Sequence, residues 1–302
     1  MTFSAANRAQ QARGRLTAAL AGLALAVPNH ISAGGVAPEL PGIQVLEQRV
    51  GSVPVICLSN PQLAEMTVSL EFTLDNLTPS VAVPFQVVLA PKQTTAPLVA
   101  LRPTEPGRPW HFTYNSYFTW GTPFARQTTN ELYLLPFTPG SSYRVVQGHD
   151  GTFSHTGEDR FAIDFGVPEG TPVLAARDGL VVMVRDGFDV GAPDPSYKKR
   201  ANQIFIRHSD ATLGEYLHLL KGGMKVKTGD HVRAGQLIAL SGNSGYSRGP
   251  HLHFMVFRAK DSKSRESLPI RFIAKEGTGI DLDQGKSYTS VRGTNAEPVF
   301  GQ

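Results

Sequence analysis

Polar and apolar residues alternate over short stretches of this chain, as they do in β-strands. Residues 67–74, Thr-Val-Ser-Leu-Glu-Phe-Thr-Leu, alternate with a period of two, which is typical of a strand with one buried face. Residues 83–91 form a second run with prolines at its ends, where strands tolerate them. Turn residues recur between such runs, and no helical period stands out. We therefore predict a small β-sandwich over residues 43–143.

Residues 144–260 continue the strand pattern and hold most of the histidines. A long surface loop is expected at residues 189–199. Residues 261–302 are polar and end in a glycine-containing stretch, so we expect a loosely ordered tail. The predicted fold class is all-β, with a C-terminal antiparallel β-sheet domain after the sandwich. Its strands are expected at residues 171–176, 179–184, 203–207, 215–219, 230–240 and 251–258.

Composition agrees with a globular protein large enough for two domains. The 302 residues are 41% hydrophobic and 18% charged, and 30 Gly and 22 Pro favour turns between short strands. Cys57 is the only cysteine, which excludes an internal disulfide. The net charge of +4 falls to +1 without residues 1–33, which hold three basic residues and no acidic one. No basic patch with interleaved aromatics stands out, so we predict no nucleic-acid partner.

The N-terminus has the pattern of an export signal. Arg13 and Arg15 precede an uncharged apolar run at residues 16–27, which is shorter than the roughly 20 residues of a membrane span. The alternative is a buried or amphipathic first helix. We predict a signal peptide at residues 1–33, a Gly- and Pro-rich linker at 34–42, and an exported protein of the periplasm or cell envelope. No later segment resembles a transmembrane helix.

The segment His251-Leu252-His253 carries the clearest chemical signal. Alternate residues of a strand point to the same face, so both imidazoles are expected to leave the sheet together while Leu252 and Phe254 point the other way. Burying two imidazoles costs free energy unless their nitrogens have a binding partner. Zinc is the obvious candidate, because imidazole is a common zinc ligand. For an isolated pair of this kind, the alternative is two hydrogen-bonded histidines on a half-exposed strand.

Catalytic zinc uses three protein ligands and one open position, and three further residues are candidates for this site. Asp164 lies in an apolar run, where an unpaired carboxylate would be costly; it either ligates metal or bonds backbone amides or an arginine. His155 lies in a polar turn and is either a ligand or a surface histidine. His218 lies between apolar neighbours and is either catalytic or a core histidine.

Taken in order, these motifs resemble the lysostaphin-type, LytM-like zinc metallopeptidases, bacterial endopeptidases that cut peptide cross-links of the cell wall. The resemblance covers residues 148–257, about a third of the chain. Besides the His and Asp-Phe of residues 155 and 164–165, the matching features are Gly-Thr-Pro-Val at 170–173, residues 175–179, Tyr-Leu-His-Leu at 216–219, residues 229–236, Gly-Asn-Ser-Gly at 242–245, and Ser-Arg-Gly-Pro-His-Leu-His-Phe at 247–254.

The resemblance implies a role for each candidate. His155, Asp164 and His253 occupy the places of the zinc ligands, and His218 and His251 those of the histidines that flank the activated water. One departure concerns His155, because eight residues separate it from Asp164 where many family members have three. His149 is the alternative ligand.

The implied function is zinc-dependent cleavage of peptide cross-links in peptidoglycan. The chief rival is a non-catalytic cell-wall-binding factor or hydrolase activator on the same fold. Such proteins are expected to lose metal ligands or catalytic histidines, whereas this chain keeps all five positions. Residues 226–238 also resemble a biotinyl or lipoyl domain, but we find no modifiable lysine at a hairpin tip.

The remaining residues of interest carry weaker signals. Tyr216 and Arg248 are candidates for substrate contact, with core packing and a solvated turn as the respective alternatives. We interpret His208 and His231 as structural.

Overall fold

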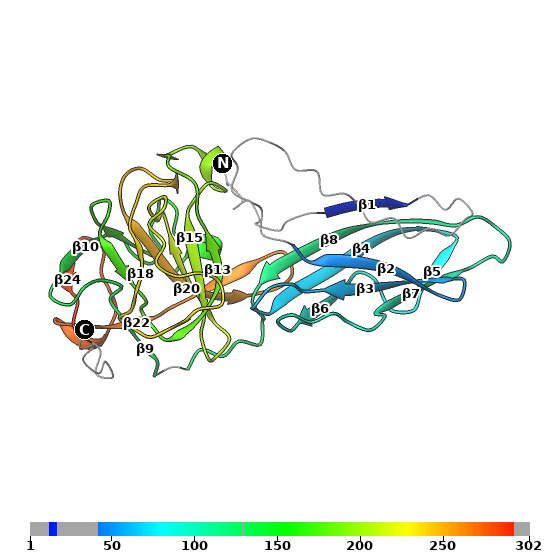
Figure 1. Cartoon of the computed structure of the whole chain (residues 1–302), viewed down its shortest axis with the longest axis horizontal. Coiled ribbons are helices and arrows are strands. Elements are labelled where there is room, and N and C mark those ends of the chain that lie inside the picture. The colour runs from blue at the N-terminus through cyan, green and yellow to red at the C-terminus, as the bar shows by residue number, and fades with distance from the viewer. Residues whose placement is uncertain (1–11, 17–41, 129, 293–302) are drawn as a thin grey trace. The chain divides into compact units, whose positions relative to one another are not determined.

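The computed structural model describes residues 12–16, 42–128 and 130–292 (Figure 1). Within these ranges there is no α-helix, only the 3₁₀ turns η1 (Gly157–Asp159) and η2 (Pro195–Tyr197), which confirms the all-β prediction. None of the described segments is a helix with the length and hydropathy to span a membrane. The expected signal peptide (1–33) and linker (34–42) lie outside the described residues, apart from a strand at residues 12–16 and Gly42.

Contacts divide the chain into two units. The first, which we call the sandwich unit, includes described residues 12–16, 42–119 and 261–263. Side chains of its strands such as Ile56, Leu58, Val68 and Leu70 are fully buried, so the alternating pattern supplies an apolar interior. The unit has two four-stranded sheets: β1 (Ala12–Leu16), β8 (His111–Trp120), β4 (Met66–Asp75) and β6 (Phe85–Leu89), and then β2 (Gln44–Val50), β3 (Val53–Ser59), β7 (Val99–Pro103) and β5 (Leu77–Pro79).

The second unit, which we call the histidine-rich unit, includes the described residues from 120 to 260 and from 264 to 292. It is built on a nine-stranded sheet. In order, this sheet contains β17 (His231–Val232), β13 (Gly179–Arg185), β15 (Gln203–Arg207), β16 (Leu213–Leu217), β20 (Leu252–Ala259), β11 (Ile163–Gly166), β10 (Ser142–Gln147) and β24 (Ser287–Thr289), with β21 (Arg265–Leu268) also paired to β20.

Three small sheets complete the histidine-rich unit. They are β12 (Pro172–Leu174) with β18 (Leu237–Leu240), β14 (Gly191–Ala192) with β19 (Gly245–Tyr246), and β9 (Leu132–Leu134) with β22 (Arg271–Ala274) and β23 (Gly277–Ile280). The pairs β14–β19 and β9–β22 are parallel, and neighbouring strands of the large sheet are antiparallel.

The core of the histidine-rich unit lies on one face of its central strands. Phe165 of β11, Tyr216 of β16, and Leu252 and Phe254 of β20 are at most 1% exposed and belong to one apolar cluster. Because strand side chains alternate between faces, Asp164, between Ile163 and Phe165, must lie on the opposite face. Packing of the apolar core therefore fixes the face of the sheet on which Asp164 lies.

The contact boundary between the units differs from the expected boundary at residue 143. It falls between residues 119 and 120, because β9 pairs with β22 and the side chains of Tyr133 and Phe137 are buried in the histidine-rich core. The short apolar run around β9 has the same pattern as the sandwich strands, so periodicity alone could not assign it to the second unit.

The tail beyond residue 260 is also more ordered than expected. Residues 265–289 contain β21 to β24, and Phe272 and Tyr288 are buried in the histidine-rich core. Residues 268–274, Leu-Pro-Ile-Arg-Phe-Ile-Ala, carry an alternating strand pattern that the tail prediction overlooked, whereas Tyr288 stands alone among polar residues. β22 pairs with β9, and β21 and β24 extend the large sheet.

The expected strand at residues 230–240 is two strands. Between β17 and β18 the chain turns at Gly235, whose φ of +83° favours glycine. The amide of Gln236 donates to the carbonyl of Arg233 and closes the turn. Likewise the loop expected at 189–199 contains β14 and η2.

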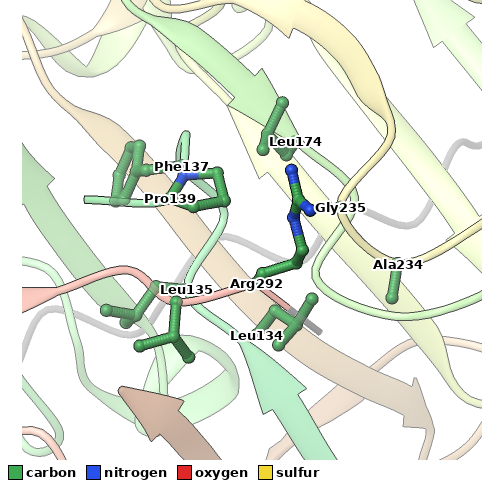
Figure 2. Close-up of a pocket in the computed structure, with 9 residues that line it drawn as sticks. Leu134, Leu135, Phe137, Pro139, Leu174, Ala234, Gly235 and Arg292 are labelled. Atoms are coloured by element: carbon green, nitrogen blue, oxygen red, sulfur yellow. The ribbon is translucent and has the colours of Figure 1, made fainter. Parts of the chain in front are cut away.

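An apolar cavity of about 210 Å³ lies in the histidine-rich unit, away from its clustered histidines (Figure 2). Its lining includes Leu134, Phe137, Leu174 and Arg292, and no histidine or carboxylate. This cavity therefore lacks the groups that metal chemistry requires.

A buried arginine ties η1 to the large sheet. Arg265 of β21 is 7% exposed, and its Nη1 and Nη2 donate to Glu215 Oε2 of β16 and to Asp159 Oδ1 of η1, each at 2.7 Å. Its amide donates to Glu158 Oε1 at 3.3 Å. The segment between His155 and Asp164, which is longer than the family pattern, is thus held against two strands.

We expect Arg265→Met to lower the free energy of unfolding by about 3–5 kcal/mol, because it removes the arginine that pairs with the buried carboxylate of Glu215. Urea denaturation measures the loss. As a control, Arg160→Gln removes an exposed pair with Asp150 and should cost about 1 kcal/mol or less. If both variants lost the same free energy of unfolding, Arg265 would not have the stabilising role assigned to it.

His208 predicts a pH dependence of stability. It is 1% exposed and its Nδ1 donates to the carbonyl of Asp178 at 2.7 Å. Burial lowers the pKa of His208 from 6.5 to about 4. The unfolded chain therefore binds this proton more readily, and stability should fall as pH drops from about 6.5 to about 4.

We expect the stability of the wild-type chain to fall more steeply over this interval than that of His208→Gln, by up to about 1.4 kcal/mol per pH unit. Urea denaturation at several pH values compares the slopes, which is more informative than absolute stability because the substitution itself disturbs the core. Parallel slopes would show that His208 is not the titrating group.

Candidate metal centre

Asp164 and His253 are direct neighbours across two strands. In the antiparallel pair β11–β20, Asp164 lies opposite His253, flanked by the pairs Ile163–Phe254 and Phe165–Leu252. The four flanking side chains are buried in the apolar core, so Asp164 and His253 share the other face. His253 Nδ1 lies 2.9 Å from Asp164 Oδ1.

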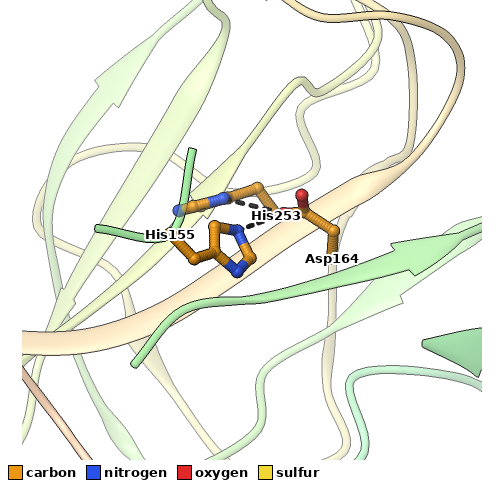
Figure 3. Close-up of side chains that lie close together, drawn as sticks. All are labelled: His155, Asp164 and His253. Carbon is orange, nitrogen blue, oxygen red and sulfur yellow. Dashed lines mark hydrogen bonds and ion pairs between the residues drawn. The ribbon is translucent and has the colours of Figure 1, made fainter. Parts of the chain in front are cut away.

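His155 joins this pair from the turn before η1. Its side chain is fully buried, and Nδ1 donates to the carbonyl of Gly148 at 2.8 Å, which fixes the tautomer and leaves the Nε2 lone pair unprotonated. Nε2 lies 3.1 Å from Asp164 Oδ1 but forms no hydrogen bond of good geometry. Figure 3 shows both imidazoles directed at the carboxylate.

The three side chains have the composition of a metal site. One ligand atom from each of His155, Asp164 and His253 lies within 4.8 Å of the others, and all three residues are buried. Two imidazole nitrogens and one carboxylate oxygen are donors that zinc accepts, with a fourth position open. A buried imidazole nitrogen without a partner, as at His155, is also what a missing cation would leave. The residues therefore fit zinc.

Electrostatics agree with a charged carboxylate in the cluster. Burial alone would raise the pKa of Asp164, but the adjacent imidazoles of His155 and His253 outweigh it and hold that pKa well below its usual range. Burial opposes protonation of His253, yet Asp164 raises its pKa. The cluster thus concentrates negative charge on an oxygen that faces two imidazoles, and a cation would be stabilised there.

Gln147 holds the other oxygen of the carboxylate. Its Nε2 lies 3.3 Å from Asp164 Oδ2 and 2.7 Å from Ser154 Oγ. Gln147 comes from β10, opposite Asp164 at an irregular point in the β10–β11 register. Such outer contacts orient a ligand and reduce its freedom to rotate.

His218 adopts an unusual backbone conformation at the end of β16. The strand ends at Leu217 rather than at the expected residue 219, and His218 has a φ of +64°, a conformation that costs a non-glycine residue roughly 1–2 kcal/mol. Its Nδ1 donates to the carbonyl of Ser244 at 2.7 Å. In this strained conformation the ring points toward the cluster. Its centroid lies 6.0 Å from the centroid of the His253 ring.

His251 lies beside His218. It precedes β20, which begins at Leu252, yet its ring still shares the side of His253: the centroids of His251 and His218 are 4.4 Å apart. Its Nδ1 donates to the carbonyl of Gly249 at 2.8 Å, and its Nε2 lies 3.9 Å from Asp164 Oδ1.

His218 is electrically neutral near pH 7. Burial, followed by the nearby imidazoles of His251 and His253, holds the pKa of His218 well below its ordinary value. Since Nδ1 carries the proton that Ser244 accepts, the Nε2 lone pair is free to accept another proton.

The structure brings the five predicted residues close together. The metal-ligand cluster found among the described residues contains His155 and not His149, whose ring packs against Phe161. His208 is buried elsewhere in the core, and His231 is exposed on β17. Tyr216 is fully buried and its hydroxyl accepts from the amide of Ala176, so it packs rather than contacts substrate.

Sequence reasoning missed Gln147 and the anchoring role of Ser244. Ser244 lies within a motif that the resemblance matched, so its position near the site was detectable. Gln147 carries no such signal, because only the pairing of β10 with β11 brings it to Asp164.

Comparison with known proteins covers the same part of the chain. The model of peptidase family M23 matches residues 158–265. This segment contains Asp164, His218, His251 and His253 but begins three residues after His155. The assignment of His155 therefore depends on geometry.

Three relatives extend the match. They are an uncharacterized metalloprotease of Buchnera aphidicola (38% identical; 35% of this chain, 27% of that protein), peptidoglycan DD-endopeptidase ShyA of Vibrio cholerae (38%; 38% and 25%), and lysostaphin of Staphylococcus staphylolyticus (37%; 39% and 23%). The chain spans about a quarter of the length of these curated relatives. Residues 158–265 of this chain form a peptidase family M23 domain.

Proposed function

We propose that this protein is a zinc-dependent endopeptidase that cleaves peptide cross-links of bacterial peptidoglycan in the periplasm or cell envelope. The observation that carries the proposal is the convergence of His155, Asp164 and His253 in one buried cluster. The M23 domain supports a peptidase, and the names of the Vibrio and Staphylococcus relatives supply the substrate class.

In this proposal His155, Asp164 and His253 hold the metal. When bound, zinc supplies Lewis acidity, which lowers the pKa of a water molecule to about 7 and polarises a peptide carbonyl. Gln147 keeps the carboxylate oriented, and the carbonyl of Gly148 keeps His155 in the tautomer that presents Nε2.

His218 and His251 move protons in the proposed reaction. His218 is neutral with a free Nε2 lone pair, so it accepts a proton from the attacking water. His251 presents Nε2 on the same side. Because its Nδ1 proton is bonded to the Gly249 carbonyl, the doubly protonated ring is the form that would donate a hydrogen bond from Nε2 to the oxygen that becomes negative. A positioned acid or base of this kind typically contributes about 10²–10⁴-fold.

The rival function is a cell-wall factor that binds or activates other hydrolases without cleaving. Five chemically competent side chains, a strained His218 and a fixed tautomer at His155 favour the enzyme, because a binding role needs none of them. Purified chain incubated with isolated peptidoglycan, followed by separation of the released peptides, tests the proposal. We expect cleavage that a chelator abolishes and zinc restores. Cleavage that survives complete zinc removal, or none by zinc-loaded protein, would overturn it.

One prediction of the proposed function concerns metal content. We expect about one tightly bound zinc per chain, lost on dialysis in His155→Ala, Asp164→Asn and His253→Ala because each removes a ligand. His149→Ala is the matched control and should keep its zinc. Elemental analysis gives the ratios, and zinc retained by His155→Ala but lost by His149→Ala would reverse the assignment.

A second prediction separates proton transfer from metal binding. We expect His218→Asn to lower kcat by about 10²–10⁴-fold while zinc content stays unchanged, because this ring accepts a proton without ligating metal. His231→Asn, in an exposed histidine, should behave as wild type in both measurements. Loss of zinc from His218→Asn would instead identify this residue as a ligand.

A further inference from the structure

Two stacked aromatic side chains, with a cationic side chain at each end, lie on segments that adjoin the candidate metal centre. Arg248 Cζ lies 3.6 Å from the centroid of the Phe153 ring. Phe153 stacks on Tyr246, with centroids 5.6 Å apart and planes at 27°. Lys198 Nζ in turn lies 5.5 Å from the centroid of the Tyr246 ring. We call these four residues the cation–aromatic ladder.

The ladder lies at the surface. Three of its residues belong to the segments that contain His155, Ser244 and His251. Phe153 is 37% exposed and lies two residues before His155. Tyr246 follows, by two residues, the carbonyl that accepts from His218. Arg248 is exposed, three residues before His251. Three ladder residues therefore lie within three residues of His155, Ser244 or His251 along the chain, and we expect a peptide bound at the centre to extend over them.

The two cations of the ladder have no acidic partner in the described part of the chain. The ion pairs recorded there include neither Lys198 nor Arg248. Acidic residues of the neighbouring loop are engaged elsewhere: Asp189 pairs with Lys221, and Asp194 accepts from the amide of Ser196. Lys199 and Arg200 add further exposed positive charge. Positive charge gathered beside a site attracts anionic ligands.

The stacked geometry leaves the donors of Arg248 available. A guanidinium held over a ring at 3.6 Å is oriented by its face, whereas its N–H groups lie along its edge. That edge matches a carboxylate through two parallel hydrogen bonds, which are stronger than neutral ones. Stacking also restricts the long side chain before it binds, so less conformational entropy is lost on binding.

We propose that the cation–aromatic ladder binds a free carboxylate of the peptide substrate, through Arg248 and Lys198. The inference rests on the proposed endopeptidase function and deepens it: the enzyme selects acidic cross-linked peptides over neutral ones. Phe153 and Tyr246 act as supports that hold the two cations in place.

Calorimetric titration with a matched ligand pair tests this. One ligand is a cross-linked stem-peptide dimer with free carboxylates, and the other is the same dimer with those carboxylates converted to carboxamides. Zinc-free full-length chain is used for binding, so that no ligand is cleaved. We expect the free acid to bind about tenfold more tightly, with the difference shrinking at high ionic strength.

The double variant Arg248→Gln/Lys198→Gln should bind both dimers equally, whereas Lys227→Gln, which removes an exposed lysine elsewhere on the histidine-rich unit, should keep the preference. Equal binding of both dimers by the wild type, or an unchanged preference in the double variant, would overturn the inference.

Cleavage by the zinc-loaded chain separates this inference from the proposed function. If the binding preference is found but neither dimer is cleaved, the carboxylate site stands and the endopeptidase function fails. If both dimers are cleaved and bound equally well, the function stands and the carboxylate site is wrong.

Discussion

The pairing of Asp164 with His253 across β11 and β20 is the contact on which the rest of the site depends. It places a buried carboxylate beside a buried imidazole, and the flanking pairs Ile163–Phe254 and Phe165–Leu252 fix the register because they fill the core. A slip of one residue in either strand would send the carboxylate or the imidazole into the apolar face. The hydrophobic core therefore determines the geometry of the polar cluster.

Segments outside these strands complete the site. His155 arrives on a long segment that Arg265 secures to the sheet through Asp159 and Glu215. His218 is turned inward by a left-handed backbone that Ser244 helps to hold. Both arrangements carry a cost, one in buried charge and the other in backbone strain. Sites that need exact side-chain positions commonly retain such local costs.

Sequence alone was sufficient for much of this picture, for physical reasons. The strand predictions at residues 179–184, 203–207 and 251–258 agree closely with β13, β15 and β20, because these strands pass through the apolar core and their side chains alternate between its two faces. The prediction of one strand at residues 230–240 was wrong, because apolar residues on both sides of a turn have the pattern of a single strand. Phe272 lies in an alternating apolar run at residues 268–274 that the tail prediction overlooked, whereas Tyr288 is an isolated apolar residue that becomes buried only through the pairing of β24 with β10. Gln147 and the Arg265 cluster depend on long-range contacts and left no local pattern.

The central claim is that one divalent cation is held by His155, Asp164 and His253. Anomalous X-ray diffraction from crystals of the zinc-loaded protein, with data collected on both sides of the zinc absorption edge, tests it most directly. The account predicts a single strong peak bounded by these three side chains, at about 2.0–2.2 Å from two nitrogens and one oxygen. A zinc peak elsewhere in the protein, with direct Asp164–His253 contact preserved, would contradict it.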